Sequence, residues 1–396
     1  MKYYKFGLLV FFTLLFTIGG KAVTLVGMYK RGEITLVEDP SFGKNTDWET
    51  LLYNYGKEFT IGPDGSIYVA HGQQHFISKF NMNGNFVRNF MQAGQGPLDC
   101  FLPHDLSILD DKYLVVVDFV EYRKITLVDL DHIDTKHVIV LKTNQIPWKV
   151  IALKGNKIAY LSRKFKTISK WEQKRIHQVI LKNTVTGNEA VVATYEYNYK
   201  SRSTGAIYYI VHDRVWFWDV YIARSNDGNL IVGASDRPTL DIISTEGKKI
   251  KTINLNLPVI KMTNEDKSVI DKIANSRRIK TSSGYTMDSE FKNIILASSF
   301  FGDHFPYYKA IATDSIGNIL VFPNDQCRKD CDFKFQVYSP EGKYICTTKI
   351  NPGKFKLEFT RFGLYTIAFT DKGIFGIWDL KDAEDIYLRI VKVKIQ

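Results

Sequence analysis

The sequence lacks the short motifs that mark the common hydrolytic active sites. It contains no Gly-x-Ser-x-Gly, which exposes a nucleophilic serine on a sharp turn, and no His-Glu-x-x-His, which places two zinc ligands on one helix face. The eight histidines are scattered, and His71 and His75 follow a predicted strand rather than lying on a helix. We therefore expect no catalytic residues and favour a protein that is not an enzyme.

Cysteine is scarce, and its placement excludes the usual structural zinc site. Three of the four cysteines cluster, but no histidine lies near them, so a four-ligand set is missing. Cys327 and Cys331 flank a polar turn, and Cys346 lies on a predicted strand after it. The alternatives are a local disulfide within this trio or ordinary buried thiols, with Cys100 free or buried.

Long apolar runs are absent except at the N-terminus. Lys2 and Lys5 precede the uncharged run Phe6–Ile18, and small residues lead to Ala22. This layout predicts a secretory signal peptide over residues 1–22. The alternative is an uncleaved membrane anchor, but the run is shorter than the roughly 20 residues that span a bilayer. We expect a secreted or periplasmic protein with no transmembrane span after cleavage.

Positive charge exceeds negative charge, with 53 Lys and Arg against 42 Asp and Glu, a formal net charge of +11. The cations fall in scattered groups, of which the largest is in the segment from Arg163 to Arg175, and we interpret them as a solvated exterior. Nucleic-acid binding is not expected, because no recognised module is present and the predicted address is outside the cytoplasm. We expect a monomer.

What the sequence does contain is a repeated pattern of short apolar runs and glycine turns. In most units, a run ends in a turn such as Asp64-Gly65 or Asp227-Gly228, a strongly apolar run follows, and a polar loop leads to two further runs. Glycine suits hairpin turns because they require positive φ. The units cover residues 59–87, 105–140, 150–188, 221–248, 310–343 and 365–393.

Six units of four antiparallel strands predict an all-β fold, a six-bladed β-propeller over residues 23–396. The orphan strand within Gly32–Asp39 is predicted to pair with the last blade and close the ring, which removes a sheet edge. Two insertions break the period. Arg163–Lys174 predicts a lengthened loop or hairpin, and residues 263–303 predict a short helix over Asn264–Ala274, between the fourth and fifth blades.

One loop carries a family resemblance. The segment Gly94–Pro103 resembles the Gly-x-Gly-Pro-x-x-Phe-x-x-Pro signature of exported six-bladed propellers related to NHL-repeat proteins, with Cys100 in the aromatic position and Phe101 one place later. The resemblance implies the fold and a secreted or periplasmic address. It implies little chemistry, because many members of that family have no assigned activity.

Two groups of residues are candidates for ligand binding. His71 and Asp118 directly follow the second strands of their units, where propeller loops border the central channel. A calcium site there would need several converging oxygen ligands, and one clear carboxylate is too few, so we expect no cofactor and keep calcium as the alternative. Aromatic side chains cluster before the fourth and fifth blades. The candidate ligand-binding residues are His71, Asp118, His212, Arg214, Trp216, Trp218, Tyr307 and Tyr308.

These observations favour a non-catalytic binding or scaffold propeller that recognises a protein or a glycan through loops on one face. Large rings also fill the space between twisted sheets, so packing is the competing role for the aromatic residues. The alternative function is a metal-dependent hydrolase or lyase with its site in the central channel.

Overall fold

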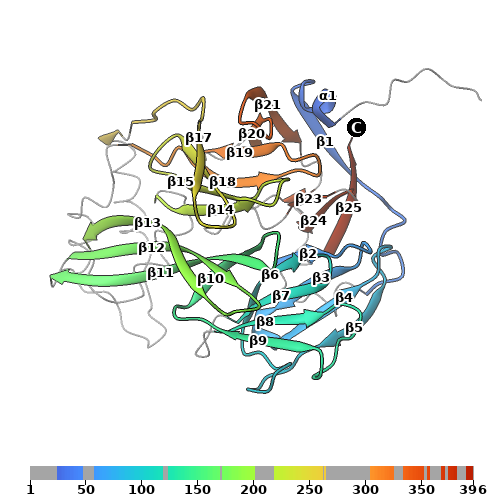
Figure 1. Cartoon of the computed structure of the whole chain (residues 1–396). Coiled ribbons are helices and arrows are strands. Elements are labelled where there is room, and N and C mark those ends of the chain that lie inside the picture. Colours follow the sequence, from blue (N-terminus) through green and yellow to red (C-terminus); the bar gives the residue numbers. More distant parts are fainter. Residues whose placement is uncertain are drawn as a thin grey trace, which may run out of the picture.

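The structure is a computed structural model that describes residues 25–47, 58–118, 124–169, 172–200, 218–261, 263–264, 304–324, 333–351, 355–356, 367–370, 373–380 and 389–395. Within these residues β-strands dominate, and they are grouped in sheets around a central region (Figure 1). No helix among them has the length and apolar character that a membrane span requires. The predicted signal peptide lies outside the described residues.

Four sheets have four antiparallel strands each, in chain order. The first contains β2 (Glu58–Ile61), β3 (Ile67–His71), β4 (Phe76–Phe80) and β5 (Phe86–Phe90), and the second contains β6 (Pro103–Leu109), β7 (Tyr113–Asp118), β8 (Lys124–Asp129) and β9 (Val138–Lys142). The third contains β10 (Pro147–Ala152), β11 (Lys157–Ser169), β12 (Glu172–Asn183) and β13 (Glu189–Lys200), and the fourth contains β14 (Val220–Arg224), β15 (Leu230–Ala234), β16 (Thr239–Ile243) and β17 (Lys249–Asn254). The first strands of neighbouring sheets pack side by side, β2 with β6, β6 with β10, β10 with β14, and β14 with β18. This is the arrangement of a β-propeller.

The fifth sheet has nine strands and corrects the predicted blade count. It contains β18 (Tyr308–Thr313), β19 (Ile319–Pro323), β20 (Phe333–Tyr338), β21 (Tyr344–Asn351), β1 (Glu33–Glu38), β25 (Arg389–Ile395), β24 (Gly373–Leu380), β23 (Ile367–Thr370) and β22 (Phe355–Lys356). The prediction of six blades is therefore wrong for the described residues, which form five sheets. The last two predicted units share one sheet because β1 pairs with both of them.

Strand β1 joins the beginning of the chain to its end. Its first half pairs in parallel with β21, with Ile34 opposite Ile350, and its second half pairs antiparallel with β25, with Leu36 opposite Ile395. The predicted pairing between Gly32–Asp39 and the last unit is thus present. Two features were not predicted from the sequence. One is the parallel pairing of β1 with β21, and the other is the short helix α1 (Leu25–Tyr29) that precedes β1.

Glycine turns connect the strands as the sequence predicts. Gly84 lies in the turn between β4 and β5 with φ of 78°, and a Cβ there would lie 2.8 Å from the Phe42 ring. In the turn before β3, the Asp64 carboxylate accepts hydrogen bonds from the backbone N–H and the hydroxyl of Ser66. These turns reverse the chain between antiparallel strands and set the pairing register.

The core lies between neighbouring sheets. Every residue of β3 and of β15 is buried, in accordance with the apolar second run of each unit. Between the second and third sheets, Val115 and Val117 pack in one cluster with Val150 and Tyr160. Each sheet is therefore covered on both faces by its neighbours, which explains the continuous apolar runs.

The third sheet is longer than the others. Strand β10 pairs with β11 only as far as Ser162, whereas β11, β12 and β13 continue to pair with one another up to Ser169, Glu172 and Lys200. The predicted insertion Arg163–Lys174 is thus a hairpin, and it extends past β10 (Figure 1). The other predicted insertion, the helix over Asn264–Ala274, lies outside the described residues apart from Asn264.

Candidate functional site

The candidate site lies at the end of the sheets where each first strand begins and each second strand finishes. Antiparallel pairing brings these two ends together, with Asp118 opposite Pro103, Ser162 opposite Pro147, and Ala234 opposite Val220. At this end, side-chain contacts connect neighbouring sheets to one another.

Three half-buried rings form an aromatic platform, which we define as Trp218, His304 and Tyr307. The ring centroids of Trp218 and His304 are 5.3 Å apart, and those of His304 and Tyr307 are 5.2 Å apart. Trp218 lies just before β14, with Asp219 between them, and His304 and Tyr307 lie in the segment that leads into β18, so residues next to two sheets form the platform. The ring of Tyr197 on β13 lies 6.0 Å from Trp218 and adds the third sheet.

The extended part of the third sheet forms a wall beside the platform. Its register places Arg163, His177 and Tyr195 in one row across the three strands. The next row on the same face contains Arg175 and Tyr197, because alternate residues of a strand share a face. Arg175 donates a hydrogen bond to the Trp218 carbonyl oxygen, and its guanidinium lies 5.6 Å from the centre of the Tyr197 ring.

A buried ion pair fastens this wall to the fourth sheet. One nitrogen of the Arg163 guanidinium, Nη2, donates to both carboxylate oxygens of Asp219, at 2.7 and 2.6 Å. The Arg163 side chain is fully buried, and it also lies over the ring of Trp148 on β10. His177 Nδ1 lies 3.5 Å from the same carboxylate. Burial, followed by the charges of Arg175 and Arg163, holds the pKa of His177 well below its ordinary value, so this imidazole is neutral at pH 7.

The two residues predicted from the channel loops have structural contacts here. Both oxygens of Asp118 accept backbone hydrogen bonds, from Phe101 N at 2.8 Å and from Leu102 N at 2.9 Å. Asp118 thereby holds the loop that carries the signature-like residues. His71 is fully buried, with Nε2 2.9 Å from Ser78 Oγ.

Burial of His71 makes stability depend on pH. Burial lowers the pKa of His71 to about 4 from 6.5, so the unfolded chain binds the proton more readily. Stability is therefore lost as the pH falls from about 6.5 towards 4, by about 2 kcal/mol at pH 5 from this group. We expect His71→Gln to reduce the difference between the free energies of unfolding in urea at pH 7 and pH 5. An unchanged difference in the variant would contradict this assignment.

The remaining predicted site residues are divided between the platform, the core and undescribed segments. Tyr307 belongs to the platform, whereas Tyr308 is buried and donates a hydrogen bond to the Thr239 carbonyl oxygen at 3.2 Å. His212, Arg214 and Trp216 lie outside the described residues. The residues that sequence reasoning missed are His304, Arg163, His177 and Asp219.

Two of the four cysteines are described, and both are free thiols. Cys100 is buried, and its Sγ donates a hydrogen bond to the His75 carbonyl oxygen at 3.1 Å. Burial raises the pKa of this thiol to about 12, so it is not a nucleophile at neutral pH. Cys346 is half-buried, while Cys327 and Cys331 lie outside the described residues.

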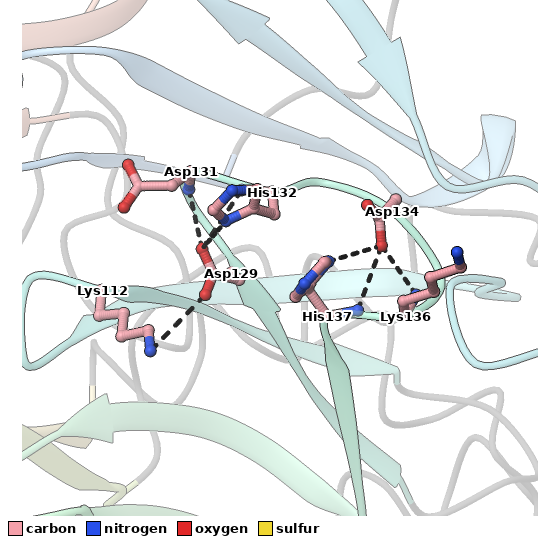
Figure 2. Close-up of polar contacts among 7 residues, drawn as sticks. All are labelled: Lys112, Asp129, Asp131, His132, Asp134, Lys136 and His137. Carbon is pink, nitrogen blue, oxygen red and sulfur yellow. Dashed lines mark hydrogen bonds and ion pairs between the residues drawn. The ribbon is translucent and has the colours of Figure 1, made fainter.

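No group of three or more potential metal ligands lies close enough to hold an ion in the part of the chain that the structure describes. The loop between β8 and β9, at the opposite end of the sheet from the platform, gathers carboxylates and imidazoles (Figure 2). There His137 Nδ1 lies 2.9 Å from Asp134, and the His132 and His137 rings are 4.8 Å apart. Asp129 and Asp134 also accept backbone N–H groups of this loop, which orders its turns.

Comparison with known proteins shows distant likenesses in shape. No family model matches the sequence, and no curated protein matches it. A putative exported protein from Bacteroides fragilis NCTC 9343 is 11% identical, with 92% of this chain and 95% of that chain covered and a TM-score of 0.49. A streptogramin B lyase is 11% identical over 85% of this chain and 78% of that chain, with a TM-score of 0.40. Regucalcin, a calcium-binding protein from Agrobacterium tumefaciens str. C58, is 9% identical over 91% and 96%, with a TM-score of 0.39. Likenesses this distant carry no information on ligand or activity.

Proposed function

We propose that this chain is a non-catalytic binding propeller that recognises a glycan or a protein outside the cytoplasm through the aromatic platform. The observation that carries the proposal is the grouping of Trp218, His304 and Tyr307, half-buried rings next to two sheets, at one end of the propeller. Aromatic side chains offer large apolar contact area with polar edges, at little cost in conformational entropy.

An ion pair next to the platform favours a glycan as the ligand, and it is placed there by the Asp236 carbonyl oxygen, 3.3 Å from His304 Nε2. The exposed Arg237 guanidinium lies 5.7 Å from the centre of the Tyr195 ring and is held by the Asp236 carboxylate at 2.8 Å. A sugar ring presents an apolar face, which suits a flat aromatic surface, and a rim of hydroxyls, which suits planar charged groups that donate and accept hydrogen bonds. The address outside the cytoplasm rests on the predicted signal peptide.

Loss of a platform ring should weaken ligand binding while the fold is retained. The protein would first be screened on a glycan array, and the strongest hit titrated by calorimetry. For Trp218→Ala we expect affinity at least about 30-fold lower, because truncation of a central aromatic anchor costs 2 kcal/mol or more. The matched control is Phe86→Ala, which removes an exposed ring from the outer strand β5. Equal losses in both variants would refute the platform as the binding surface, and binding to a protein alone would exclude a glycan.

A further inference from the structure

The end of the third sheet forms a cationic arm, which we define as residues 163–169, 172–177 and 195–200 of β11, β12 and β13. None of these residues pairs with β10, and Figure 1 shows the three strands reaching past it. Seven residues of β11 follow Ser162, which corresponds to about 23 Å of extended chain. The arm therefore stands out from the sheet at the end that also carries the aromatic platform.

Charge is concentrated on this arm. It contains six cationic side chains and two carboxylates, a net charge of +4 in a chain whose total is +11. Two of the cations, Arg163 and Arg175, are buried on the face towards the platform. Lys174 pairs with Glu196 at 2.7 Å. Lys164 and Lys166 are exposed, and neither forms an ion pair with a residue that the structure describes.

The end of β11 also exposes apolar side chains. Ile168 is 48% exposed and Phe165 is 49% exposed, although most large apolar residues of the sheets are buried. Lys164 and Lys166 point to one face of β11 and Phe165 points to the other, while Ile168 follows at the bulge between Thr167 and Ser169. The end of the arm thus combines excess positive charge with apolar side chains on a protruding element.

We propose that the cationic arm docks the protein on an anionic lipid surface. The phosphate head groups complement Lys164 and Lys166, and the region between head groups and acyl chains accepts an apolar side chain such as Ile168. A soluble anionic polymer complements only the charges, so the exposed apolar residues favour the lipid surface. A protruding arm can also reach a flat surface before the rest of the molecule meets it. This inference uses a different surface from the platform and does not depend on glycan binding.

The test is binding of the full protein, without its predicted signal peptide, to vesicles of phosphatidylcholine with and without phosphatidylglycerol. We expect binding only to the anionic vesicles at low salt, and release at high salt. Lys164→Ala/Lys166→Ala should weaken partitioning by about 30-fold, because each lysine near an anionic surface contributes about 1 kcal/mol. Ile168→Ser should weaken it several-fold without changing the net charge.

The matched control is Lys248→Ala/Lys343→Ala, which removes the same charge from two exposed turns at the opposite end of their sheets. It should bind as the unmodified protein does. Equal binding to neutral vesicles, equal losses in the control and arm variants, or no loss in the arm variants would each overturn the proposal. So would binding to an anionic polysaccharide such as heparin with no binding to anionic vesicles. Circular dichroism and thermal unfolding of each variant ensure that a loss of binding is not a loss of fold.

Discussion

Replacing Asp219 with alanine is expected to lower the free energy of unfolding by about 3–5 kcal/mol. The carboxylate accepts two contacts from the fully buried Arg163 side chain, so its removal leaves a guanidinium charge buried without this partner. The pair joins β11 of the third sheet to the start of β14, so the damage falls on the contact between two sheets. Chemical denaturation at neutral pH measures the loss.

A double variant separates the two causes of the lost stability, the unpaired buried charge and the lost side-chain packing. In Arg163→Met/Asp219→Ala both charges are absent, so the penalty for an uncompensated buried charge disappears and stability should partly recover. Asp219→Asn should be milder than Asp219→Ala, because its amide oxygen still accepts the Val220 N–H. A loss below about 1 kcal/mol in Asp219→Ala would mean that the ion pair is solvated or dispensable.

Replacing Ile390 with aspartate is expected to cost about 5 kcal/mol or more, enough to prevent folding of a marginally stable protein. Ile390 is 1% exposed and packs in one cluster with Phe42 and Phe375. The variant removes a buried apolar side chain and places a carboxylate among apolar neighbours. The affected strand, β25, also pairs with β1, so the junction of the two chain ends is lost with it.

Ile390→Val is the control for this variant, because it keeps the apolar character and removes one methylene. It should cost only about 0.5–1.5 kcal/mol. Thermal unfolding followed by circular dichroism compares the two. Native-like stability of Ile390→Asp would show that β25 is peripheral to the fold.

The strands could be predicted from the sequence because their patterns are local. Turns such as Asp64-Gly65 and the apolar runs that follow them fix a hairpin without reference to distant residues. The number of sheets could not be predicted in this way. The number of sheets depends on β1, because its two edges pair with strands far along the chain. The pattern of polar and apolar residues in β1 does not show how many strands it pairs with.

The candidate site was predicted in part for the same reason. Trp218 and Tyr307 stood out because aromatic residues cluster in the sequence near them. No such indication was present for Arg163, His177 and Asp219, because these residues come together only through the register of a long hairpin and the packing of two sheets. A usable indication was present in the alternation Tyr195-x-Tyr197-x-Tyr199, which places three rings on one face of a strand.

The position of β1 between β21 and β25 dictates the order of events during biosynthesis. Glu33–Glu38 leaves the ribosome before any of the four-stranded sheets, and Arg389–Ile395 leaves it after all of them, so the antiparallel partner of β1 is absent while those sheets are synthesised. Closure of this sheet therefore waits for β25, and the nascent chain carries an unpaired edge of β1 until that strand has been made. Until β1 and β25 meet, that edge can pair with a strand of another chain, so aggregation competes with folding most strongly in this interval.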